Sequence, residues 1–132
     1  MCLYIKAGEH YDSKQKTYYS KTATEDIFIY KVLKKYKGEW FSPYYPKRYR
    51  KNILYKTKKF YKKTNYPDIK EGFHSFQYDE YGKLSAINLQ NLFFESREIF
   101  KAMIPKGSLY WSGLENDLCS NQIMILEKIK NA

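Results

Sequence analysis

Residues 31–63 carry the side chains with the clearest chemical potential, because 13 basic residues there accompany a single acid, Glu39. Aromatic rings such as Trp40, Tyr44 and Tyr45 are interleaved with them. Cations neutralise phosphates and release counterions, and aromatic faces stack nucleobases. The segment also concentrates the excess charge of a 132-residue chain whose net charge is +10. It therefore indicates a surface for an anionic partner.

Within this segment, the basic side chains from position 47 onward are the candidates for a face that binds nucleic acid or an acidic protein. These are Lys47, Arg48, Arg50, Lys51, Lys56, Lys58, Lys59, Lys62 and Lys63. The alternative is that the tyrosines pack in the core and across strands while the lysines are solvated, since tyrosine is common on β surfaces. The chain has no sequence motif of a known RNA- or DNA-binding fold, which counts against a polymer.

Three further polar residues are candidates to contact an anion: His74, Ser75 and Lys106. His74 and Ser75 do not form a hydrolase dyad, because neighbours on a strand face opposite sides and no glycine elbow precedes the serine. A structural role for His74 remains the alternative. Lys106 lies in a Pro-Lys-Gly-Ser turn, where glycine lets a backbone approach a ligand closely. The alternative there is a plain hairpin connection.

The remaining reactive residues predict neither a metal site nor an acid–base pair. No two carboxylates stand out at predicted strand ends, and Cys2 and Cys119 are isolated, with no histidine at a zinc-like spacing. We therefore expect no catalytic residue, no metal and no cofactor. Two free thiols fit a reducing compartment. Because no apolar run suits a signal peptide or a membrane span, we expect a cytoplasmic protein without membrane contact.

These residues must be positioned by one domain over residues 1–132, judging from the length of the chain. Pro43 and Pro46 exclude a helix around them. One helix is expected at 85–95, with Ser85 as its N-cap. Apolar and β-branched runs predict strands at 2–5, 26–33, 53–55, 97–104, 109–111 and 123–126. The fold class is therefore α+β, a compact, mainly antiparallel sheet with one main helix.

Five segments in order are similar to a group of small proteins encoded by bacteriophages and prophages of gut bacteria. They are residues 26–33, 42–44, 71–76, 104–110 and 120–125. The resemblance spans most of the chain, but this group has no assigned function. It implies a phage-related protein that acts in the host cytoplasm.

Shorter matches resemble ADP-ribosyltransferases of the Arg-Ser-Glu type. Tyr30-Lys31 falls at that family's Tyr-Arg, residues 72–75 (Gly-Phe-His-Ser) at its middle strand, and residues 104–107 (Ile-Pro-Lys-Gly) at its late turn. In the family, the arginine and serine help hold NAD, and the last glutamate of a Ser-Glu-x-Glu strand drives catalysis. Here Lys31 replaces the arginine, and residues 120–122 (Ser-Asn-Gln) bring amides in place of both acids. The resemblance implies a degenerate fold of this type whose transferase chemistry is lost.

We therefore expect non-catalytic binding of a nucleotide-type anion. The sequence is also compatible with a homo-oligomer. A phage protein of this kind would sequester a host immune signal such as a cyclic nucleotide or an NAD-derived molecule. The expected ligand-binding residues are Lys31 and Lys106 for phosphate, Ser75 and Gln122 for ribose or base edges, His74, and Tyr44 or Tyr45 for stacking.

Two alternatives remain open at this point. The first is binding of nucleic acid or a host protein by the basic aromatic-rich face. The second is an active NAD-dependent ADP-ribosyltransferase or NAD glycohydrolase, with Glu115 or Asp117 as its acid.

Overall fold

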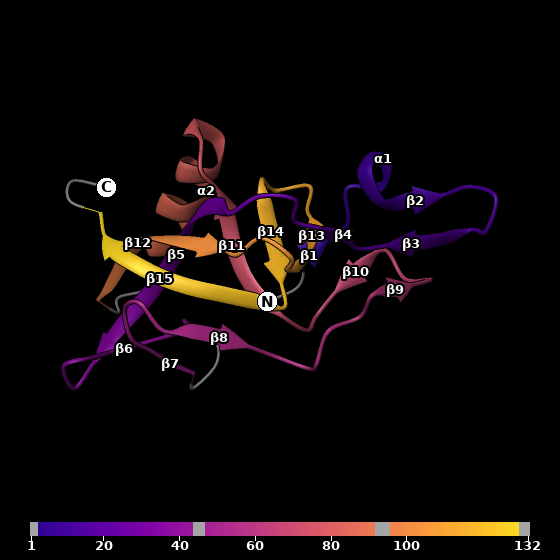
Figure 1. The fold of residues 1–132 in the computed structure, drawn as a ribbon. Coiled ribbons are helices and arrows are strands. Elements are labelled where there is room, and N and C mark those ends of the chain that lie inside the picture. Colours follow the sequence, from indigo (N-terminus) through magenta and orange to yellow (C-terminus); the bar gives the residue numbers. More distant parts are fainter. Residues whose placement is uncertain (1–2, 44–46, 92–95, 130–132) are drawn as a thin grey trace.

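A ten-stranded sheet forms the body of the computed structural model, which describes residues 3–43, 47–91 and 96–129 (Figure 1). Eight strands follow one path, in the order β4 (Lys21–Thr22), β13 (Leu109–Ser112), β14 (Asp117–Ser120), β11 (Phe73–Gln77), β5 (Ile27–Tyr36), β12 (Arg97–Ile104), β15 (Gln122–Lys128) and β8 (Leu54–Lys56). β6 (Glu39–Phe41) pairs with β5 and with β7 (Arg48–Tyr49). These strands pair antiparallel, which confirms the predicted class.

Two smaller sheets lie beside one end of this body, at the right of Figure 1. One joins β2 (Tyr11–Asp12), β3 (Thr17–Tyr19) and β9 (Lys63–Thr64), and the other joins β1 (Leu3–Tyr4) and β10 (Asp68–Ile69). A single-turn helix, α1 (Ala7–His10), packs near them. The cluster of Leu3, Ile5, Ile69, Trp111 and Cys119 joins this end to the main sheet.

The main helix, α2 (Glu80–Gln90), begins five residues earlier than predicted, and the predicted N-cap is wrong. Asp79 is the N-cap, and its carboxylate accepts a hydrogen bond from the Gly82 N–H at 2.7 Å. Ser85 lies inside the helix, where its hydroxyl donates to the Glu115 carbonyl. The prediction followed the first apolar repeat and so missed the stronger aspartate cap, which comes directly after β11. Positions 92–95 of the predicted helix lie outside the described residues.

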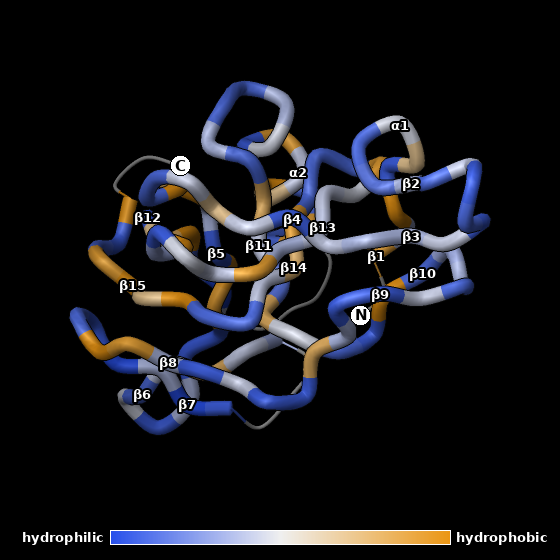
Figure 2. The backbone as a smooth tube through the Cα atoms, turned by 45° about the vertical axis from the view of Figure 1, so that its right-hand side comes forward, coloured by the Kyte–Doolittle hydropathy of each residue, from blue (hydrophilic) through white to orange (hydrophobic). Residues whose placement is uncertain are grey.

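The two faces of the main sheet have separate cores. On one face, Val32, Phe76 and Ile99 pack against Ala86 and Leu89 of α2. On the other face, the larger cluster packs beneath the segment that contains β7 and β8; it comprises Ile29, Leu33, Tyr49, Phe73, Phe100, Ala102, Ile104, Leu118, Ile123 and Ile125. Figure 2 shows the corresponding hydrophobic stretches along the central strands. No helix in the described ranges is long and apolar enough to cross a membrane.

Candidate functional site

The central feature of the site is the place where β5 and β11 separate. β5 pairs with β12 on one side from Ile27 to Lys34. On its other side, Ile29 and Tyr30 pair with β11, residues 31–33 have no ladder partner, and residues 34–36 pair with β6. A sheet that opens in this way leaves backbone groups without a neighbouring strand. A cavity of about 350 Å³ lies at this opening.

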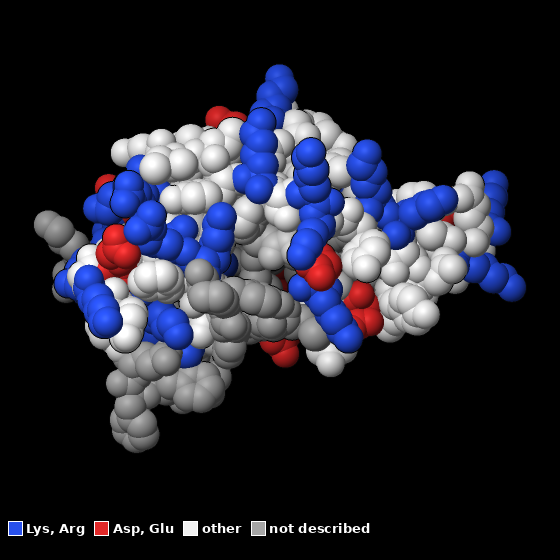
Figure 3. Space-filling model, turned by 90° about the horizontal axis from the view of Figure 1, so that it is seen from below, with Lys and Arg blue, Asp and Glu red and all other residues white. Residues whose placement is uncertain are grey.

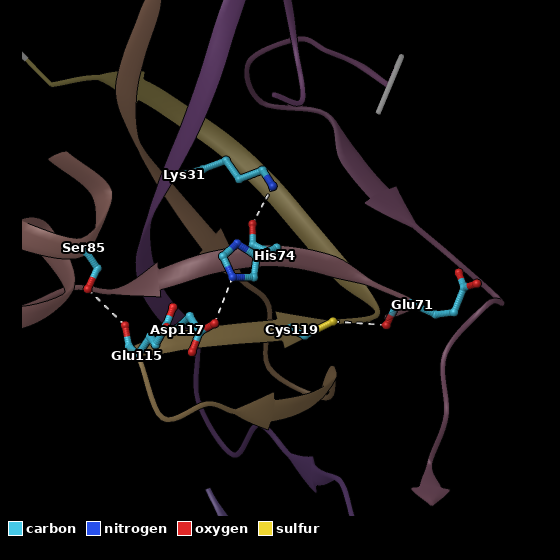
Figure 4. Close-up of polar contacts among 7 residues, drawn as sticks. All are labelled: Lys31, Glu71, His74, Ser85, Glu115, Asp117 and Cys119. Atoms are coloured by element: carbon cyan, nitrogen blue, oxygen red, sulfur yellow. Dashed lines mark hydrogen bonds and ion pairs between the residues drawn. The ribbon is translucent and has the colours of Figure 1, made fainter. Parts of the chain in front are cut away.

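Lys31 fills part of the opening. It is only 5% exposed, and its Nζ donates a hydrogen bond of 2.5 Å to the carbonyl oxygen of His74 (Figure 4). His74 lies on the part of β11 that has no ladder partner on β5. The Tyr49 ring centroid is 5.6 Å from the same nitrogen. Burial lowers the pKa of Lys31 to about 8. Within the described part of the chain no carboxylate pairs with it, so the cavity contains a mostly charged ammonium without a counterion.

His74 lines the same cavity and binds a buried acid. Its Nε2 is 3.0 Å from Oδ2 of Asp117 on the adjacent strand β14 (Figure 4). Because a carboxylate only accepts, Nε2 carries the hydrogen and Nδ1 is the acceptor of the neutral ring. Burial lowers the pKa of His74, and the hydrogen bond to Asp117 opposes that shift. The other oxygen of Asp117, Oδ1, is buried and has no partner in the described structure.

The cavity has an apolar lining and a basic rim. Val32, Phe73, Phe76 and Leu89 contribute apolar wall, while the exposed rim includes three lysines and one carboxylate: Lys47, Lys59, Lys70 and Glu71. Figure 3 shows the face with β6, β7 and β8, where lysine and arginine side chains are spread across the surface. An anion that approaches this face meets net positive charge before it reaches Lys31.

Two of the predicted ligand-binding residues, Lys31 and His74, meet at the cavity. Ser75, which follows His74 in the sequence, is fully buried, and its hydroxyl has no partner in the described structure. Its side chain projects to the opposite side of β11 from His74, as the strand alternation predicts. Ser75 is not among the residues that line the cavity.

The other predicted ligand-binding residues are placed elsewhere. Lys106 is exposed in the turn between β12 and β13, where its backbone N–H donates to Asp26 at 2.8 Å. Gln122 pairs with Lys56 at the β15–β8 edge of the sheet. Neither lines the cavity. Tyr44 and Tyr45 lie outside the described residues.

The predicted basic face is distributed over several elements. Lys47 and Lys59 line the cavity of Lys31, whereas Arg48, Arg50 and Lys51 line a second cavity. The remaining members are exposed on β8, on β9 or on the chain between them: Lys56, Lys58, Lys62 and Lys63.

Sequence reasoning missed Tyr49 as a wall of the site and did not pair Asp117 with His74. Tyr49 is 4% exposed, and burial raises its pKa. Cys119, directly opposite His74 on β14, also lines the cavity; burial raises the pKa of its thiol to about 12, so it is not a reactive thiolate. The two acids considered for catalysis, Glu115 and Asp117, do not line the cavity.

Comparison of the chain with protein-family models, with curated proteins and with solved structures found no match. The fold and site define the class directly: an α+β protein built on an antiparallel sheet, with a cationic cavity where two central strands separate.

Proposed function

We propose that the cavity between β5 and β11 binds an anionic, nucleotide-type ligand without transforming it. The observation that carries this proposal is Lys31, a buried cation for which the described residues supply a carbonyl oxygen but no counterion. The lowered pKa corresponds to a cost of about 3 kcal/mol for keeping the charge inside the fold. An anion bound in the cavity would offset that cost.

The cavity also suits the uncharged parts of a nucleotide. Its volume of about 350 Å³ lies within the usual range of roughly 300–1,000 Å³ for small-molecule sites. Phe73, Phe76 and Tyr49 offer aromatic and apolar surface for a base. Thr57 and Glu71 at the rim are suitable partners for ribose hydroxyls. The phosphate would then lie near Lys31.

The resemblance to ADP-ribosyltransferases supports the same ligand class. Two of its segments, Tyr30-Lys31 and residues 72–75, border the opening between the strands. The segments 104–107 and 120–122 do not line the cavity. Only the first two matching segments therefore support the nucleotide proposal. We propose a degenerate fold of that type, which would act by sequestering its ligand, as a phage protein that removes a host immune nucleotide would.

A thermal-shift and calorimetry panel tests the proposal with AMP, NAD, ADP-ribose and cyclic dinucleotides. A ligand at 100 times its dissociation constant should stabilise the fold by about 2.7 kcal/mol. We expect Lys31→Met to abolish this stabilisation. The matched variant Lys106→Met removes an exposed lysine outside the cavity and should preserve it. Failure of every nucleotide to stabilise the wild type, or equal binding by Lys31→Met, would contradict the proposal.

The same samples test whether the bound nucleotide is left intact. Chromatography after incubation should recover NAD and the other ligands unchanged. Release of nicotinamide would instead identify an NAD-cleaving enzyme.

A second candidate function is nucleic-acid binding, which is favoured by the basic side chains spread over the face in Figure 3. It predicts oligonucleotide affinity that falls steeply with salt, because each neutralised phosphate releases counterions. Strong oligonucleotide binding by Lys31→Met would favour this second function over the first.

A further inference from the structure

A second cavity of about 350 Å³ shares Tyr49 with the first as a lining residue. Lys47 contributes to the first cavity, whereas Arg48, Arg50 and Lys51 contribute to the second. Tyr49 packs into the core cluster beneath this segment, so one buried ring is a wall of both cavities. The proposed function does not use the second cavity.

The floor of this second cavity is apolar. It comes from the buried Leu33, Phe100 and Ile125 on three adjacent strands, β5, β12 and β15. Trp40 of β6 forms a wall and packs edge-on against Phe100, with ring centroids 4.8 Å apart. Trp40 is only partly buried, so the cavity combines an accessible planar indole with an apolar floor. Such a surface suits the face of another aromatic ring.

The charged residues around this floor are predominantly basic. Glu39, the acid in the lining, is already paired with Arg48 at 3.1 Å. Arg50 and Lys51 are exposed, and the described structure pairs neither with an acid. The Nζ of Lys35 lies 5.8 Å from the Trp40 ring centroid. The cavity therefore presents two uncompensated cations beside an indole.

We propose that this second cavity binds a nucleoside phosphate unit, with the base against Trp40 and the phosphate on Arg50 and Lys51. A guanidinium and an ammonium at the opening match phosphate oxygens, and an indole beside them matches a base. A purely solvated basic surface would need neither the apolar floor nor the indole wall. The unit belongs either to a free nucleotide or to single-stranded nucleic acid, since both present the same base and phosphate.

Tryptophan fluorescence tests this site selectively. The chain has two tryptophans, and Trp111 is fully buried in the cluster near β1, away from this cavity. Titration with AMP and with an oligothymidylate of eight nucleotides should quench the emission of Trp40. Trp40→Phe should remove the quenching, and Arg50→Gln with Lys51→Gln should weaken apparent affinity at least tenfold. Lys106→Gln, an exposed lysine elsewhere, is the matched control and should change nothing.

The two probes distinguish the source of the nucleotide unit. Quenching by AMP identifies a free-nucleotide site, whereas quenching by the oligonucleotide alone, with steep salt dependence, identifies a unit of single-stranded nucleic acid. No quenching by either probe up to millimolar concentration would overturn the proposal. Quenching that survives Trp40→Phe, or that ignores the Arg50 and Lys51 substitutions, would overturn it as well.

Lys31→Met separates this proposal from the proposed function. It should leave the Trp40 signal intact while the ligand-induced stabilisation at the first cavity is lost. Loss of the Trp40 signal in Lys31→Met would overturn the second site as an independent one.

Discussion

The two histidines lie in regions that differ in how many of their buried polar groups are hydrogen-bonded. His10, at the end of α1, is 5% exposed, and backbone groups satisfy both of its ring nitrogens. Its Nδ1 donates to the Tyr19 carbonyl at 2.8 Å, and its Nε2 accepts from the Ser112 N–H at 2.8 Å. The ring also packs beside Trp111 at 5.0 Å. His10 therefore joins α1, β3 and β13 as a structural link.

The region of His74 leaves comparable groups incompletely satisfied. Among the described residues, Lys31 donates to one acceptor, the carbonyl oxygen of His74. Within the described ranges, Oδ1 of Asp117 and the hydroxyl of Ser75 are buried without a partner. Native proteins pair nearly all buried polar groups, so unpaired ones call for an explanation such as a ligand site. Of these three groups only Lys31 lines the cavity, so the contrast with His10 supports the proposed ligand site through Lys31 alone.

The largest expected effect comes from breaking the His74–Asp117 pair. His74→Leu leaves a buried carboxylate without its partner, so we expect the free energy of unfolding to fall by about 3–5 kcal/mol. Denaturant titration measures it. Adding Asp117→Val should restore most of the stability, because replacing both members of a buried pair with apolar residues is often neutral. A single substitution that costs under about 1 kcal/mol would contradict the comparison.

The next largest expected effect is a gain, not a loss, in the free energy of unfolding. Lys31→Met removes an uncompensated buried charge, so the ligand-free protein should gain about 3 kcal/mol of stability at pH 7. Denaturant titration of both proteins at several pH values measures the gain.

The pH dependence of that gain follows from the pKa of Lys31, which is 10.5 unfolded and about 8 folded. Below pH 8 both states hold the charge, so the cost is fully present. Between pH 8 and 10.5 the unfolded state binds more protons, and the wild type becomes more stable as the pH rises. The gap between wild type and Lys31→Met should therefore close over this range. A gap that stays constant with pH would show that the gain has another cause.

The structural histidine should behave differently from the pair at the cavity. His10→Leu leaves the Ser112 N–H and the Tyr19 carbonyl without partners, at a cost of about 2–3 kcal/mol. Because both partners are backbone groups, no second side-chain substitution should rescue the loss as Asp117→Val does for His74→Leu. Denaturant titration of His10→Leu and of the double variant His10→Leu/Asp117→Val measures the free energy of unfolding. A double variant that regains the stability lost in His10→Leu would contradict the contrast between the two histidines.

The smallest effect is acid destabilisation. Burial lowers the pKa of both His10 and His74 from 6.5. Below pH 6.5 the unfolded state therefore binds more protons than the folded state. The free energy of unfolding then decreases as the pH is lowered, by at most about 1.4 kcal/mol per pH unit for each histidine. Each leucine variant should show a shallower slope between pH 6.5 and 5 in denaturant titrations. Equal slopes in all three proteins would contradict the assignment.

Local patterns were sufficient to predict the central strands. The apolar runs at 26–33 and 97–104 correspond to β5 and β12 because both strands are buried between two cores. β14 was not predicted, since its four residues (Asp-Leu-Cys-Ser) are too few to show an alternating or apolar run. The divergence of β5 from β11 is a tertiary feature that no local pattern encodes.

The site was predicted only in part for the same reason. A lysine between Ile29 and Leu33, on the side of β5 that faces the larger core, was a usable signal for Lys31. The His74–Asp117 contact spans 43 positions and depends on the register of β11 with β14. Lys106 and Gln122 were placed near the others by resemblance, and the sheet order separates them from the cavity.

The order of strands in the main sheet also determines which strand edges another chain could pair with. Its edge strands, β4, β7 and β8, have two or three residues each and carry the exposed Lys21, Arg48 and Lys56. Beyond β8, the end of β15 carries the exposed Glu127 and Lys128. Long apolar strands such as β5 are internal. Short, charged edges give another chain little template for strand addition, so a β-rich protein of this kind resists edge-to-edge aggregation.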